Sequence, residues 1–176
     1  EWPSVVRRRR VIVCVVLVAG ATLMAYSLNQ RPGAASFYWL TLSLAAVWTV
    51  GALLSGPLHL GRITWRESAK RPVLTGAAVG LLLGGFFLLG GLVVRHIPVV
   101  AERITRVLEY TNHGPLLLIV LIALVNGVAE ELFFRGALYT ALGGFHPVAS
   151  STLLYAIATS ATGNPMLGFA ALVLGA

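Results

Sequence analysis

Long apolar runs, separated by short polar or basic stretches, account for most of the chain. A helix needs roughly 17–25 apolar residues to cross the hydrocarbon layer of a bilayer, which is about 30 Å thick. The runs and their flanking turn residues predict a single membrane-embedded domain over residues 1–176. Its expected spans are at about 11–28, 37–54, 73–94, 115–142, 147–162 and 165–176. The pattern therefore predicts an all-α fold, a polytopic transmembrane helical bundle with about six helices.

Three details refine this expectation. The third run, 73–94, is rich in glycines at short spacings, which let helices approach closely, so we expect it to pack inside the bundle. Residues 99–109 have apolar positions at helical spacing with charges on the other side, as in a short interfacial helix. The last run stops at Ala176 without a polar flank, so we expect the C-terminus to be truncated.

Composition and charge support a membrane location. Hydrophobic residues make up 57% of the chain and charged residues 11%, against roughly 25% charged residues in soluble domains. The net charge of +7 comes from short basic blocks between the spans. Such blocks indicate which loops face the cytoplasm, so we expect no nucleic-acid partner. The N-terminus and second loop hold eight cations, and the first and third loops hold four. We therefore expect an integral protein of a bacterial plasma membrane with a cytoplasmic N-terminus.

Ionisable side chains cluster inside one apolar run. Glu130, Glu131 and Arg135 lie in the fourth span, where each charge costs at least about 2.5–3.5 kcal/mol on insertion scales. On a helix, Glu131 and Arg135 share a face and can pair, whereas Glu130 points about 100° away and into the bundle. Glu130 is then suited to act as a general base towards water. The spacing leaves open a purely structural Glu–Arg pair at a helix end.

The run Glu130-Glu131-Leu-Phe-Phe-Arg135-Gly resembles the EExxxR signature of the CAAX protease and bacteriocin-processing (CPBP) family, which includes the type II CAAX prenyl endopeptidases. The resemblance covers roughly residues 125–176. It implies an intramembrane endopeptidase in which Glu130 acts on the catalytic water, with Glu131 and Arg135 in support. Tyr155 and Thr159 stand where the family has the Phe and His of an FxxxH motif. The family's HxxxN-like motif would lie beyond Ala176.

The resemblance also bears on cofactors and partners. Family members are often described as metalloproteases, so zinc is possible, but the sequence shows no ligand set for it and the metal stays unknown. Thr159 can hydrogen-bond a water or a carbonyl oxygen, but it cannot bind a metal as imidazole does. All four histidines are expected in loops: His59, His96, His113 and His146. We expect no other cofactor, a peptide or membrane-protein substrate, and contact with the lipid bilayer.

The sequence thus predicts a CPBP-type endopeptidase that hydrolyses a peptide bond near the cytoplasmic face, its catalytic group comprising Glu130, Glu131, Arg135 and Thr159. Two alternatives stay open. A catalytically silent relative could bind a membrane or peptide partner through the same cavity, since Thr159 replaces the expected histidine. A proton-coupled transporter could use Glu130 and Glu131 as a relay, because intramembrane carboxylates also line ion paths.

Overall fold

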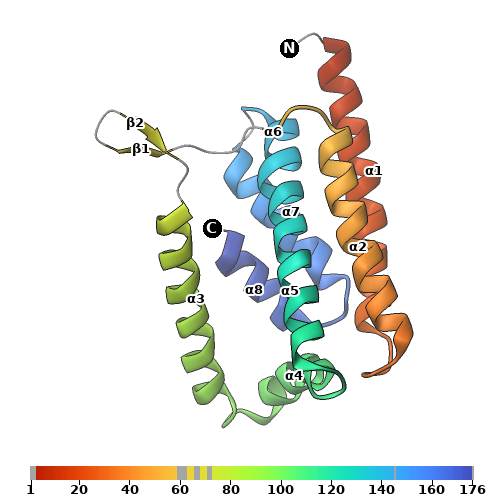
Figure 1. The fold of residues 1–176 in the computed structure, drawn as a ribbon, viewed down its shortest axis with the longest axis vertical. Helices are drawn as coiled ribbons and strands as arrows, with labels where there is room; N and C mark the ends of the chain where they lie inside the picture. Colours follow the sequence, from red (N-terminus) through yellow and green to blue (C-terminus); the bar gives the residue numbers. More distant parts are fainter. Residues whose placement is uncertain (1–2, 59–62, 66–67, 71–72, 145, 176) are drawn as a thin grey trace.

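The computed structural model describes residues 3–58, 63–65, 68–70, 73–144 and 146–175. Its elements are α1 (Pro3–Leu28), α2 (Ala35–Leu54), β1 (Ile63–Trp65), β2 (Ser68–Lys70), α3 (Val73–Val94), α4 (Pro98–Leu108), the 3-10 helix η1 (Glu109–Asn112), α5 (Leu116–Glu130), the π-helix η2 (Glu131–Leu138), α6 (Tyr139–Leu142), α7 (Pro147–Ser160) and α8 (Pro165–Gly175). Figure 1 shows the expected helical bundle, which is confirmed for the described residues.

Four of the described helical segments are long and apolar enough to cross a membrane. They are Pro3–Leu28, Ala35–Leu54, Gly76–Val94 and Leu116–Leu142. The last one joins α5, η2 and α6 into a continuous helical rod that agrees with the expected span at 115–142 to within one residue. The protein is therefore an integral membrane protein.

The core lies where α1 and α2 meet the middle of this rod. Trp48 of α2 is completely buried, and its ring centroid lies 4.6 Å from that of Phe133 and 5.1 Å from that of Phe134, both in η2. Gly20 of α1 faces Trp48 so closely that a Cβ there would lie 2.1 Å from the indole. This packing fixes α2 against η2, the segment that contains Glu131 and Arg135 and directly follows Glu130.

The first helix is longer than the apolar pattern predicted, because it begins at Pro3 and winds through the arginine run. Arg9 is buried and its Nε donates to the carbonyl oxygen of Ser55 at 3.1 Å, just after α2. Arg10 donates to the carbonyl oxygen of Ala141 in α6 at 3.2 Å. These two side chains satisfy carbonyl groups at helix ends and so connect the basic start of α1 to α2 and α6.

The expectation that residues 73–94 pack inside the bundle is wrong. None of the glycines in α3 has an atom within 4 Å of where a Cβ would be, and no residue of its apolar window is buried. Figure 1 shows α3 to one side of the other helices, connected to them through α4. Glycine permits close approach but supplies no side chain to make contacts, so glycine spacing alone does not position a helix.

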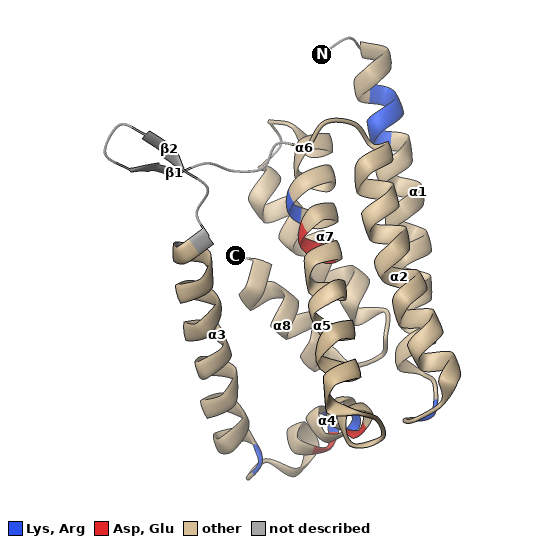
Figure 2. Ribbon diagram, in the orientation of Figure 1, with Lys and Arg blue, Asp and Glu red and all other residues tan. Residues whose placement is uncertain are grey.

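The connections between the spans hold one expected and one unexpected element. The amphipathic helix predicted at 99–109 is present as α4, with an ion pair of 2.5 Å between Glu102 and Arg106. The basic loop after α2 contains a short antiparallel hairpin, in which Ile63 of β1 is opposite Lys70 of β2. Figure 2 shows the charges of α4 at the opposite end of the molecule from the arginines of α1.

Candidate active site

The backbone changes its winding where the carboxylates begin. Glu130 is the last residue of α5, and the π-helical turns of η2 start at Glu131. π-Helical turns are rare and often occur at functional sites. The wider winding still brings Glu131 and Arg135 together, with 2.8 Å between Oε1 of the carboxylate and Nη1 of the guanidinium. The ion pair expected from the four-residue spacing is therefore present, although the helix is not α-helical there.

Glu130 points away from this ion pair and towards α7. The hydroxyl group of Tyr155 donates to Oε2 of Glu130 at 2.6 Å. Tyr155 is itself buried, and its ring centroid lies 4.6 Å from that of Phe134. The packed ring fixes the hydroxyl group, and the hydroxyl group in turn fixes the direction of the carboxylate. Glu130 thus has a defined orientation inside the bundle.

Arg135 connects three elements around the carboxylates. Besides pairing with Glu131, its guanidinium group donates to the carbonyl oxygen of Leu174 in α8. Its Cζ lies 5.7 Å from the centroid of the Tyr155 ring, a distance at which a cation attracts the face of an aromatic ring. The side chain of Glu131 is 60% exposed, whereas Glu130 is only partly exposed. The ion pair therefore forms the open edge of the site and Glu130 its inner part.

Among the described residues, no hydrogen bond joins Thr159 to Glu130 or Glu131. Thr159 is buried one turn after Tyr155, and its hydroxyl group interacts with the carbonyl oxygens of Tyr155 at 2.8 Å and of Ala156 at 3.1 Å. A hydroxyl group has one proton to donate, and this one is directed to the backbone of its own helix. The contact that sequence reasoning missed is the one made by Tyr155. The sequence feature that could have indicated this contact is a Tyr within an apolar helix, because a buried Tyr hydroxyl group usually has a hydrogen-bond partner.

The residues present do not fit a zinc site. Within the described ranges, no three residues among His, Cys, Asp and Glu are close enough together to hold a metal ion. His96, His113 and His146 lie outside the regular helices, as expected, and His59 falls outside the described residues. Two carboxylates that are already engaged by Tyr155 and Arg135 are not the four-coordinate set that zinc prefers. We therefore derive no chemical step through a metal.

Comparison with known proteins bears on the segment that contains the site. Residues 112–176 match the family model described as Type II CAAX prenyl endopeptidase Rce1-like. This segment includes every element of the site, from α5 to α8. The family resemblance predicted from the EExxxR run is confirmed for these residues. No curated protein and no solved structure matches the chain.

Proposed function

Because residues 112–176 carry the Rce1-like domain of an intramembrane protease family, we propose that this protein is an intramembrane endopeptidase that uses Glu130 to activate water. The observation that best supports this is the orientation of Glu130, whose carboxylate Tyr155 holds inside an apolar bundle. A carboxylate is costly at that depth, and intramembrane ionisable groups commonly mark functional sites. Its separation from the Glu131–Arg135 ion pair leaves it available for chemistry.

The proposed reaction is the hydrolysis of a peptide bond. Oε2 of Glu130 accepts the hydrogen bond from Tyr155, and we assign Oε1 to the water molecule. Glu130 takes a proton from this water as the water oxygen attacks the carbonyl carbon of the scissile bond, and the C–N bond then breaks. The same proton passes from Glu130 to the departing amine. Arg135 acts as a positioning residue, because it holds Glu131, Tyr155 and α8 in place around Glu130.

Replacing the base tests this proposal. The probe is a fluorogenic peptide library, used with and without a farnesylated cysteine at the fourth position from the C-terminus, and added to the whole protein in lipid vesicles. We expect the Glu130→Gln substitution to reduce the cleavage rate by about 100-fold or more, because general-base catalysis contributes 10²–10⁴-fold. Glu102→Gln is the matched control, since it makes the same chemical change on the distant helix α4 and should leave the rate unchanged.

Two results would contradict the proposal. Cleavage by the Glu130→Gln protein at the wild-type rate would remove Glu130 from the chemistry. Peptides that bind to the wild-type protein and to the Glu130→Gln protein, without cleavage by either, would favour a catalytically silent binding protein instead.

We also propose that the protein lies in a bacterial plasma membrane with its N-terminus in the cytoplasm. Arg7 to Arg10 lie at the same end of the molecule as the end of α2, opposite to α4 (Figure 2). Short cytoplasmic segments carry an excess of Lys and Arg. Glu130 is the fifteenth residue of α5 and lies in the half of the Leu116–Leu142 rod nearer the arginines. In this orientation, the peptide bond would be cleaved in the cytoplasmic half of the membrane.

A further inference from the structure

The four consecutive arginines of α1 divide into two pairs. Arg9 is buried and Arg10 is exposed, but both donate to backbone carbonyl oxygens, after α2 and in α6. Arg7 and Arg8 are exposed, and neither makes an ion pair or a hydrogen bond with a residue that the structure describes. The inner pair fixes the rotation of α1 about its own axis, and the outer pair is left facing away from the protein.

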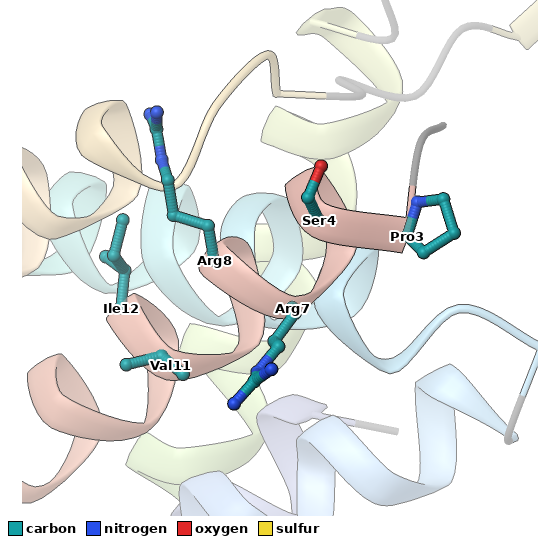
Figure 3. A pocket seen from close by; sticks show the side chains of 6 residues that line it. All are labelled: Pro3, Ser4, Arg7, Arg8, Val11 and Ile12. Atoms are coloured by element: carbon teal, nitrogen blue, oxygen red, sulfur yellow. The ribbon is translucent and has the colours of Figure 1, made fainter.

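The outer pair lies beside a groove on the surface of α1. Residues four apart on a helix lie above one another, so Pro3, Arg7 and Val11 form one row and Ser4, Arg8 and Ile12 form the next. The groove between these rows has a volume of about 560 Å³ and is open. In Figure 3 the side chains of Arg7 and Arg8 extend from the helix in opposite directions, away from each other. Along the axis of α1, the groove is therefore lined first by Pro3 and Ser4, then by the two arginines, and then by the aliphatic side chains of Val11 and Ile12.

The length of α1 positions this groove at the level of the lipid headgroups. Its 26 residues span about 39 Å at 1.5 Å per residue, which exceeds the roughly 30 Å of the hydrocarbon layer. The apolar part, 11–28, accounts for about 27 Å of this length. Figure 1 shows the first turns of α1 extending beyond α2 and α6. Arg7 and Arg8 then lie among lipid phosphates, while Val11 and Ile12 lie where the acyl chains begin.

Charge at this end of the molecule favours an anion. Among the described acidic residues, Glu102 and Glu109 lie on α4 and η1 at the opposite end, and Glu130 and Glu131 are inside the bundle region (Figure 2). Guanidinium groups bind phosphate oxygens through paired, charge-assisted hydrogen bonds. Basic residues next to a membrane span attract anionic lipids.

We propose that this groove binds an anionic phospholipid. The guanidinium groups of Arg7 and Arg8, on the two sides of the groove, attract the headgroup phosphate, and one acyl chain follows Val11 and Ile12. A soluble phosphate would use the guanidinium groups but not the aliphatic end of the groove, so the order of side chains favours a lipid. The bound lipid would fix the depth of α1, whose next turns pack against α2.

Native mass spectrometry of the whole protein in detergent tests the proposal, with phosphatidylglycerol and phosphatidylcholine as the added lipids. We expect the double substitution Arg7→Gln and Arg8→Gln to weaken phosphatidylglycerol binding about tenfold or more, and to leave phosphatidylcholine binding unchanged. The control is the double substitution Arg31→Gln and Arg95→Gln, which removes the same charge from two exposed residues outside the groove. It should preserve phosphatidylglycerol binding. Arg7→Lys with Arg8→Lys keeps the positive charge and should lose less affinity than the glutamine pair.

Three results would overturn the proposal. The first is unchanged phosphatidylglycerol binding in the Arg7→Gln, Arg8→Gln protein, provided that its melting temperature in phosphatidylcholine equals that of the wild type. The second is an equal loss in both double variants, which would indicate general attraction to positive charge. The third is displacement of the lipid by glycerol 3-phosphate at equal concentration, because a soluble phosphate would then be a sufficient ligand.

Discussion

Removing only the hydroxyl group of Tyr155 separates its two contributions to the site, the orientation of Glu130 and the packing of the ring. Tyr155→Phe keeps the ring against Phe134 and beneath Arg135 but removes the hydrogen bond to Glu130. A hydrogen bond of this kind contributes roughly 1–3 kcal/mol. We expect thermal unfolding in detergent to shift down by at least roughly 2–4 °C. We also expect cleavage to slow while substrate binding is kept, since Glu130 loses its fixed direction.

Tyr155→Ala provides the comparison, because it removes the ring as well. Truncating a buried aromatic side chain costs roughly 3–5 kcal/mol, so this variant should unfold at a clearly lower temperature than Tyr155→Phe. Identical melting temperatures for the wild type and Tyr155→Phe would show that the hydrogen bond does not stabilise the fold. Unchanged cleavage in that same variant would mean that Glu130 needs no help from α7.

The sequence predicted which charged residues form the site better than it predicted the contacts between them. The spacing of Glu131 and Arg135 was enough to predict their ion pair, because neighbours on one helix face are local in sequence. The contact between Glu130 and Tyr155 joins residues on two helices, and no periodicity within one helix reveals it. Thr159 was placed by resemblance alone, and the structure shows its hydroxyl group bonded to its own helix.

At the scale of the elements, α1 and α2 pack through glycines. Gly20 of α1 accommodates Trp48, and Gly51 of α2 accommodates Val16 in the same way. A Cβ at Gly20 would lie 2.1 Å from the indole ring, which cannot shift without disturbing Phe133 and Phe134. Gly20→Ala should therefore destabilise the protein by about 1–3 kcal/mol, measured by thermal unfolding in detergent.

Gly84→Ala in α3 is the matched control for that substitution. No atom lies within 4 Å of a Cβ at this position, so the added methyl group meets nothing. Alanine also favours a helix over glycine by up to about 1 kcal/mol. The melting temperature of Gly84→Ala should be equal to or above that of the wild type. A loss of stability as large as that of Gly20→Ala would show that α3 packs tightly, as its glycine pattern had predicted.

The elements differ in how well their sequence predicts them. Hydrophobic run length was sufficient for the helices, because the backbone of a spanning segment must satisfy its own hydrogen bonds. The helical start at Pro3 was missed, since it depends on carbonyl groups at Ser55 and Ala141 that are distant in sequence. The π-helical winding of η2 was missed as well. Hydrophobic spacing does not distinguish π-helical from α-helical turns over so short a segment.

At the scale of the whole molecule, the charges divide the protein into two unlike ends. The arginines at the start of α1 lie at one end, and α4 with its ion pair between Glu102 and Arg106 lies at the other (Figure 2). Helical segments that are long and apolar enough to cross a membrane, among them the Leu116–Leu142 rod, run between these ends. This asymmetry supports the proposed orientation of the protein on grounds that do not depend on the active site.

Cysteine labelling tests that orientation directly. The native Cys14 is first replaced by Ala, and a new cysteine is then introduced either at Ser4, near the arginines, or at Thr111, beside α4. Both positions are exposed. Since positively charged segments stay in the cytoplasm, a membrane-impermeant maleimide should label the Thr111→Cys protein in intact cells. It should label the Ser4→Cys protein only after the cells are permeabilised. The reverse pattern would place Arg7, Arg8 and the half of the rod that contains Glu130 on the outer side, and the proposed cytoplasmic cleavage would then be wrong.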